Sequence, residues 1–229
     1  MVKIAILGPG GVGAFLAAAF DRAGQDVTVV ARERTAEALL RDGIEVESVR
    51  LGDFSAHPPA VPALTEEVDV LFVATKATTL EDALERIHAT PRLVVPLLNG
   101  LEHLALLRER FGSGRVAAAA IRIESSSSRP GQVKQTSPFL RIDLASADPA
   151  LAPRLKKLVA VLEDAGVPAR LEASEAHVMW SKLVRLVALA CTTSATDQPI
   201  GFIRSDPEWR ATLVAVRLGP AINSRRSPR

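Results

Sequence analysis

Residues 3–24 read KIAILGPGGVGAFLAAAFDRAG, and this stretch decides the fold. The apolar run KIAIL leads directly into a loop with glycines at positions 8, 10 and 13, and an apolar helical pattern follows at once. The spacing G-x-G-x-x-G between a strand and a helix is the fingerprint of a Rossmann dinucleotide-binding domain. Gly8 permits the tight turn, Gly10 lets the backbone approach a pyrophosphate, and Gly13 permits close packing of the helix on the strand.

A glycine triplet can also be a purely structural turn. The strand before it and the helix after it favour the dinucleotide site, because a helix N-terminus supplies free N–H groups and the positive end of a dipole. We therefore expect the cofactor to lie against a loop formed by Gly8, Pro9, Gly10, Gly11, Val12 and Gly13.

Up to about residue 121, apolar strand-like runs alternate with amphipathic helical patterns, which predicts an α/β fold with a Rossmann-type doubly wound parallel sheet. The expected strands are Lys3–Leu7, Val27–Ala31, Val68–Ala74, Leu93–Leu98 and Val116–Ile121. The expected helices are Val12–Ala23, Thr35–Arg41, Leu80–Ile87 and Glu102–Arg110, with Gly24, Gly43 and Gly112 as C-terminal stops.

Between Ile121 and Leu144 the pattern changes to short β segments separated by serine, proline and glycine, which predicts an antiparallel extension of the sheet. A helix at Pro153–Ala165 and a short strand at Ala169–Glu172 follow. These segments complete a predicted NADP-binding Rossmann domain over residues 1–172.

A partial helical domain is expected over residues 173–218. Ser174 is a good N-cap for a long helix to about Thr193, which is apolar on almost every face and therefore resembles a helix buried on all sides. A second helix, Asp206–Leu218, precedes residues 219–229, whose Gly, Pro, Ser and Arg content predicts a disordered tail. A domain of only two helices cannot cover the apolar surface of the long helix. We therefore expect an incomplete all-helical C-terminal domain, left by truncation or an altered reading frame.

Arg32 decides which dinucleotide is expected. An enzyme specific for NAD usually carries Asp or Glu at the end of the second strand, to bind the ribose 2′-hydroxyl. Here the run DVTVVA continues into Arg32, with Arg34 close behind. A guanidinium pairs well with a 2′-phosphate, so the sequence predicts NADPH, although a solvated surface arginine is the plainer alternative.

Two further polar residues follow strands at the same edge of the predicted sheet. Lys76 comes after VDVLFVAT, and Asn99 comes after LVVPLL. Ligands of open α/β sheets bind outside the carboxyl ends of the strands, so we expect both side chains near the glycine loop. Either residue taken alone could be an ordinary loop residue.

Lys182 stands out within MWSKLVRLVALAC. A lysine on so apolar a helix costs free energy to desolvate unless it snorkels, pairs or faces a polar cleft. A desolvated lysine also titrates closer to working pH, which suits a proton donor. The residues alone leave both readings open, a snorkelling lysine and a general acid.

Composition excludes several classes of protein. The net charge is only +2, there is no Tyr, and aromatic residues make up 4%, so a base-stacking nucleic-acid surface is not expected. No apolar run is long enough for a membrane span, and neither a signal peptide nor a metal-ligand motif is present. The single Cys191 lies in an apolar run, which favours a small buried side chain and a cytoplasmic location.

Taken in order, GPGGVG, the arginine after the second strand, VATKA, LLNG and EAHVMWSKL resemble the ketopantoate reductase (2-dehydropantoate 2-reductase) family over about residues 1–210. The resemblance implies an oxidoreductase of pantothenate biosynthesis, which reduces a 2-oxo acid with NADPH in a cleft between a Rossmann domain and a helical domain. Lys182 would be the general acid, Asn99 would bind the substrate or the nicotinamide, and Lys76 would help to hold the cofactor or the substrate carboxylate. A homodimer is compatible with this reading.

The sequence also departs from the family. Leu186, Val187 and Ala190 stand where relatives usually place asparagines on the helix, and the later helices that carry a substrate-binding serine and an acidic residue have no counterpart. One alternative is therefore a catalytically impaired remnant that still binds NADPH. A Rossmann dehydrogenase that uses NAD and another acid is disfavoured by Arg32.

Overall fold

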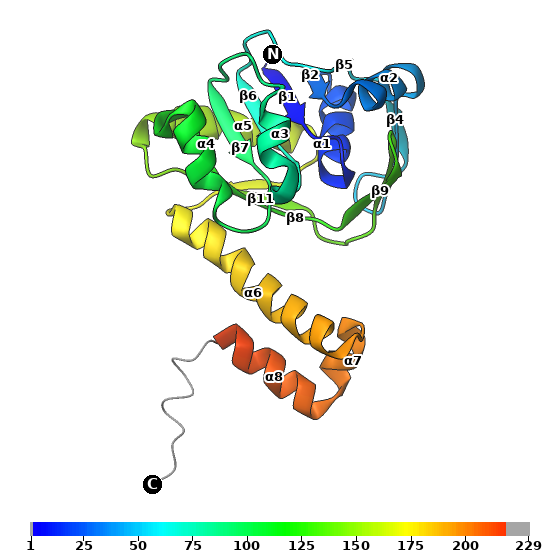
Figure 1. Cartoon of the computed structure of the whole chain (residues 1–229), viewed down its shortest axis with the longest axis vertical. Helices are drawn as coiled ribbons and strands as arrows, with labels where there is room; N and C mark the ends of the chain where they lie inside the picture. The colour runs from blue at the N-terminus through cyan, green and yellow to red at the C-terminus, as the bar shows by residue number, and fades with distance from the viewer. Residues whose placement is uncertain (1, 219–229) are drawn as a thin grey trace. The chain divides into compact units, whose positions relative to one another are not determined.

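The computed structural model describes residues 2–218, which form two compact units divided between Val178 and Met179 (Figure 1). The predicted tail at residues 219–229 lies outside the described residues. The strands are β1 Lys3–Leu7, β2 Asp26–Val30, β3 Ile44–Ser48, β4 Phe54–Ala56, β5 Ala60–Val61, β6 Val70–Val73, β7 Leu93–Pro96, β8 Ala118–Arg122, β9 Ser125–Arg129, β10 Gln132–Gln135, β11 Arg141–Ala145 and β12 Ala169–Leu171. The helices are α1 Gly11–Arg22, α2 Glu33–Asp42, α3 Leu80–Leu84, α4 His103–Phe111, α5 Ala152–Asp164, α6 Glu175–Thr196, α7 Ile200–Ser205 and α8 Pro207–Leu218, with 3-10 turns η1 Ala77–Thr79, η2 Ser113–Arg115 and η3 Pro149–Leu151.

A five-stranded parallel sheet forms the centre of the first unit, in the order β5-β2-β1-β6-β7. Leu7 at the end of β1 pairs in register with Val30 of β2 and with Val73 of β6. The carboxyl ends of these strands therefore share one edge of the sheet. The predicted Rossmann-type doubly wound sheet is confirmed.

Both faces of this sheet are buried under helices. Ile4 and Ile6 of β1 are fully buried on one face, in the hydrophobic cluster that includes Phe15 of α1. Ala5 and Leu7 point to the other face and belong to a cluster with side chains of α3 and α4. Burial on both faces explains why the strand reads as an unbroken apolar run.

The antiparallel part of the fold is divided between two smaller sheets. β8 pairs antiparallel with β11, and Val116, which precedes β8, forms a single parallel bridge with Val94 of β7. The segment predicted as a fifth parallel strand therefore ends the central sheet and begins a three-stranded one. β9 and β10 instead form a hairpin that joins β3 and β4 in a four-stranded sheet. Strands β3, β4 and β5 were not expected from the sequence, and the serine run that was expected to separate β segments forms β9 itself, because pairing with β10 fixes it.

The first turn of α6 is capped as predicted. The backbone N–H of His177 donates to Ser174 Oγ over 3.0 Å. The helix extends to Thr196, three residues beyond the predicted end at Thr193. Asp206 caps α8, because its Oδ1 accepts from the N–H groups of Glu208 and Trp209.

The second unit, yellow to red in Figure 1, leaves part of the apolar surface of α6 exposed. This agrees with the expectation that too few helices are present to cover so apolar a helix, since Trp180 is 54% exposed and Val187 is 43% exposed, whereas Ala188 is buried. Helices α7, which was not predicted, and α8 are too few to cover every face of a 22-residue helix. Cys191 is exposed, not buried, because α7 and α8 leave its side of α6 uncovered, although the neighbouring Ala188 and Thr192 are buried.

Candidate functional site

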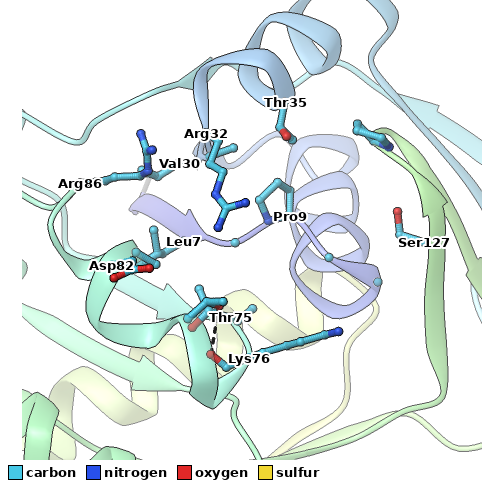
Figure 2. Close-up of a pocket in the computed structure, with 18 of the residues that line it drawn as sticks. Leu7, Pro9, Val30, Arg32, Thr35, Thr75, Lys76, Asp82, Arg86 and Ser127 are labelled. Atoms are coloured by element: carbon cyan, nitrogen blue, oxygen red, sulfur yellow. Dashed lines mark hydrogen bonds between the residues drawn. The ribbon is translucent and has the colours of Figure 1, made fainter.

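A cavity of about 990 Å³ lies at the carboxyl ends of β1, β2 and β6 (Figure 2). It belongs entirely to the first unit. Its walls come from the glycine loop, the start of α2, the segment after β6 with α3, and the β9–β10 hairpin. The lining residues are Leu7, Gly8, Pro9, Gly10, Gly11, Val30, Ala31, Arg32, Thr35, Ala74, Thr75, Lys76, Thr79, Asp82, Ala83, Glu85, Arg86, Ser126, Ser127, Ser128, Arg129 and Pro130.

The glycine loop has the geometry that a pyrophosphate site requires. Gly8 adopts φ +92°, and a Cβ there would lie 2.8 Å from the Thr75 methyl group. A Cβ on Gly13 would collide with the carbonyl oxygen of Gly8, so only glycine lets α1 pack this closely on the turn. A Cβ on Gly10 would meet no protein atom within 4 Å, so this position faces open space.

The N-terminus of α1 opens onto the same cavity. Gly10 is its N-cap and provides no side-chain hydrogen bond. The first N–H groups of a helix have no partner within the helix, and the helix dipole makes this end positive. The open face of Gly10 and the uncapped helix end therefore fit the pyrophosphate of a dinucleotide.

Arg32 is placed by the start of α2. It is the N-cap of that helix, with an extended backbone, and its carbonyl oxygen accepts from Thr35 N over 2.8 Å and from Ala36 N over 2.9 Å. Its side chain lines the cavity above the glycine loop, beside Pro9 (Figure 2). Within residues 2–218 its guanidinium makes no hydrogen bond or ion pair, so it is available to an anion.

The neighbouring carboxylate, Glu33, is held by a different arginine. Arg86 donates to Glu33 Oε1 over 3.1 Å and to the carbonyl oxygen of Pro62 over 3.0 Å. A backbone hydrogen bond at Glu33 itself, and then the hydrogen bond and charge of Arg86, lower the pKa of the Glu33 carboxyl. Arg86 thus offsets the one acidic side chain in the first turn of α2.

Lys76 reaches the cavity from the end of β6. Its backbone begins the 3-10 turn η1, and its carbonyl oxygen accepts from Thr79 N and from Thr79 Oγ1. Its side chain is exposed and extends toward the first turn of α1 (Figure 2). A flexible ammonium at this point can pair with a phosphate or a carboxylate.

The other predicted site residues lie elsewhere. Asn99 follows β7 in an exposed bend at the same edge of the sheet, outside the residues that line the cavity. Val12 and Gly13 are in the first turn of α1 and support the loop without lining the cavity. Lys182 is half-buried on α6 in the second unit, and its catalytic role stays a prediction.

Sequence reasoning missed the hairpin wall of the cavity. A Cβ on Gly11 would collide with the backbone of Ser125, so β9 passes directly against the start of α1. Ser125 Oγ also donates to the Gly11 carbonyl oxygen over 2.8 Å. The only signal in the sequence was the second adjacent glycine of the loop, which the G-x-G-x-x-G spacing itself does not require.

The described residues contain neither a helix with the length and hydropathy needed to cross a membrane nor a group of three or more His, Cys, Asp or Glu side chains that could hold a metal ion.

A family model covers more than half of the chain. The model described as ketopantoate reductase PanE/ApbA matches residues 4–148. The uncharacterized oxidoreductase YkpB of Bacillus subtilis is 29% identical over 219 residues, which are 92% of this chain and 71% of that protein. The crystal structure of 2-dehydropantoate 2-reductase from Geobacter metallireducens has a TM-score of 0.86 and 26% identity, over 95% of this chain and 73% of that chain.

A more distant neighbour shows the fold alone. The ternary structure of D-mandelate dehydrogenase with NADH and anilino(oxo)acetate has a TM-score of 0.79 at 19% identity, over 92% of this chain and 70% of that chain. The same fold therefore occurs in proteins with different names and different bound molecules.

Proposed function

The chain belongs to the ketopantoate reductase family of oxidoreductases, and we propose that it binds NADPH in the glycine-loop cavity and reduces a 2-oxo acid to a 2-hydroxy acid. One observation carries the proposal. The open face of Gly10, the uncapped N-terminus of α1 and the Arg32 guanidinium all meet in one cavity at the carboxyl edge of the sheet. Ligands of open α/β sheets bind at this edge.

The preference for NADPH over NADH rests on the start of α2. Arg32 has no anionic partner within the described residues, and the carboxylate of Glu33 is engaged by Arg86. The positive end of α2 adds to this field. A 2′-phosphate carries the charge and the acceptor oxygens that a guanidinium pairs with, whereas a 2′-hydroxyl offers much less.

The substrate class follows from the family and its neighbours. Ketopantoate, or 2-dehydropantoate, is a 2-oxo acid, and the D-mandelate dehydrogenase with this fold holds anilino(oxo)acetate, also an oxo acid. We therefore propose a 2-oxo acid, with 2-dehydropantoate as the first candidate. Lys76 and Asn99, at the ends of β6 and β7, are the candidates of the first unit for holding its carboxylate or the nicotinamide ring.

The reaction needs a hydride and a proton. With NADPH held by the glycine loop and Arg32, the hydride for the carbonyl carbon would come from the reduced nicotinamide. Lys182 would donate the proton to the carbonyl oxygen, and its ammonium would stabilise the negative charge that develops there. The glycine loop and Arg32 would hold the cofactor in one geometry, which lowers the entropic part of the barrier.

The proposal is tested in two steps with the unaltered chain. Calorimetry with NADPH and with NADH should show tighter binding of NADPH. Oxidation of NADPH is then followed by absorbance with 2-dehydropantoate and with a series of other 2-oxo acids. Binding without turnover for any of them would favour the alternative, an NADPH-binding protein that has lost catalysis, and absence of NADPH binding would reject the proposal.

A further inference from the structure

The β9–β10 hairpin is anchored at both ends, so its residues are held in place beside the cavity. At its base, Ser125 Oγ donates to the carbonyl oxygen of Gly11 in the first turn of α1. At its tip, the carbonyl oxygen of Gly131 accepts from Glu45 N over 2.7 Å, close to where α2 ends at Gly43. The segment between these anchors, Ser126–Pro130, forms one wall of the cavity.

Arg129 is the cationic residue of this wall. Its carbonyl oxygen accepts from Ser127 Oγ over 2.9 Å, which ties the backbone of the strand locally. Its side chain is exposed and makes no hydrogen bond or ion pair with any residue from 2 to 218. The guanidinium therefore keeps its hydrogen-bonding capacity for another partner.

The acidic residue that Arg129 influences already has a partner. Arg41 donates to both carboxylate oxygens of Asp42, over 2.8 and 2.7 Å. The hydrogen bond from Arg41 is the main reason why the pKa of Asp42 lies below its usual value, and the charge of Arg129 adds to the effect. Arg129 is thus within electrostatic reach of α2 without being neutralised there.

Charge is distributed unevenly around the cavity. The acidic lining residues, Asp82 and Glu85, both belong to the segment that contains α3. In Figure 2, Asp82 lies on the opposite side of the Arg32 side chain from Ser127 of the hairpin. The α3 wall also carries Lys76 and Arg86, whereas the hairpin wall presents Arg129 and no carboxylate. A phosphate dianion in the space between Arg32 and the hairpin therefore meets cationic groups without an acidic lining residue beside them.

We propose that Arg129 is a second ligand for the 2′-phosphate of NADPH, on the hairpin side of the cavity from Arg32, with the Thr35 hydroxyl between the two elements. The inference rests on the proposed function and deepens it, because it assigns cofactor preference to two separate parts of the fold. A phosphate monoester has enough acceptor oxygens for two guanidinium groups and one hydroxyl.

The test compares Arg129→Ala with the matched control Arg170→Ala, which removes an exposed arginine of β12 outside the cavity. Calorimetry with NADPH, NADH, 2′,5′-ADP and 5′-AMP separates the 2′-phosphate from the rest of the cofactor. We expect Arg129→Ala to lower the affinity for NADPH and for 2′,5′-ADP by about 5- to 30-fold, as for loss of one charge-assisted contact. The affinities for NADH and 5′-AMP should stay nearly unchanged. Arg170→Ala should bind all four like the unaltered chain.

The outcomes distinguish this inference from the proposed function. If Arg32→Ala weakens NADPH but Arg129→Ala binds like Arg170→Ala, Arg129 is not a ligand and the proposed function stands. If Arg129→Ala lowers the affinities for NADPH and NADH equally, the residue contacts the pyrophosphate or stabilises the hairpin, and the inference is wrong. If the unaltered chain does not bind NADPH, both proposals fail.

Discussion

Arg86, beside α3, and Glu33, the first residue of α2, form an ion pair of 3.1 Å at the cavity. The pair joins two walls that are 53 residues apart in the sequence. Its consequence is electrostatic. It offsets a carboxylate next to Arg32, at the place where a 2′-phosphate is proposed to bind.

Removing Arg86 should therefore weaken the binding of NADPH more than the binding of NADH. We expect Arg86→Ala to lower NADPH affinity by roughly 3- to 10-fold, because the uncompensated charge of Glu33 would repel the phosphate across a partly solvated gap. The affinity for NADH should fall less. Titration of both cofactors measures the effect, and the double variant Arg86→Ala/Glu33→Gln should restore NADPH binding. Failure of that restoration would mean that Arg86 acts through contact and not through charge.

Arg32 itself should have a larger effect. Arg32→Ala is expected to cost NADPH binding about 1.5–3 kcal/mol while leaving NADH almost unaffected, since only the 2′-phosphate requires a charge-assisted partner there. Fluorescence or calorimetric titration checks it, with Arg170→Ala as the control. Equal affinity of the unaltered chain for both cofactors would contradict the assignment.

Two glycines of the loop should behave differently, although the sequence motif treats them alike. Gly10 has an extended backbone with φ −74° and open space beside it, so Gly10→Ala should fold normally. Its Cβ would stand where the pyrophosphate approaches, and we expect both NADPH and NADH to bind at least about tenfold more weakly. Unchanged cofactor affinity in Gly10→Ala would place the dinucleotide elsewhere.

Gly13→Ala tests the other role. Its Cβ would collide with the Gly8 carbonyl oxygen and lie 3.1 Å from the Ala74 Cβ, so α1 would have to move. Forcing a methyl group into such a contact costs about 1–3 kcal/mol of folding free energy. Thermal unfolding should show a clear loss for Gly13→Ala and almost none for Gly10→Ala.

The parallel sheet could be predicted because burial on both faces leaves its strands as apolar runs, such as β6, whose ends were placed within a few residues. β9 could not be predicted in the same way, because SSSSR contains no apolar residue. Its position depends on tertiary contacts with Gly11 and with β10. Local pattern thus predicted three walls of the cavity and missed the fourth.

The incomplete cover of α6 was expected from the sequence, but the side chains that stay exposed could not be predicted for a related reason. A pattern that is apolar on all faces indicates what a helix would need to be fully covered, but not which segments are available to cover it. The described α7 and α8 leave Trp180 and Val187 exposed. Periodicity reports on one element, whereas burial depends on its neighbours.

Asp143 connects the two antiparallel strands β8 and β11 through charge. Arg122 and Arg141 stand opposite each other in register, and both donate to the buried carboxylate of Asp143 over 3.0 Å. Burial raises the pKa of Asp143, but the hydrogen bonds and charges of Arg141 and Arg122 outweigh it and hold the pKa below its usual value. The carboxylate therefore offsets two like charges that would otherwise repel across the strands.

Asp143→Asn should destabilise the first unit by about 2–4 kcal/mol at neutral pH. Because the pKa is lower in the folded state, the stabilisation is present above the unfolded value of about 3.9 and is lost as the pH falls through the folded pKa. The difference in unfolding free energy between Asp143→Asn and the unaltered chain should shrink below about pH 4. Denaturant unfolding at several pH values measures it, with the exposed Asp164→Asn as the control. A difference that is independent of pH would contradict the role of ionisation.

Lys182 bears on catalysis alone. If it is the general acid, Lys182→Ala should lower turnover of a 2-oxo acid by roughly 10²- to 10⁴-fold. NADPH affinity should stay nearly constant, because Arg32 and the glycine loop belong to the first unit and Lys182 to the second. A purely structural lysine would instead change thermal stability and leave turnover nearly normal.

The pH profile gives the sharper readout for Lys182. In the unaltered chain, kcat should fall as the pH rises through the pKa of the donor, because the neutral amine has no proton to give. In Lys182→Ala that limb should disappear, while Lys156→Ala, an exposed lysine of α5, should keep both the rate and the limb. This comparison requires measurable turnover of the unaltered chain with NADPH. A chain that binds NADPH but reduces none of the 2-oxo acids would support the non-catalytic alternative. Near-normal kcat and an unchanged limb in Lys182→Ala would return this residue to a snorkelling lysine on an apolar helix.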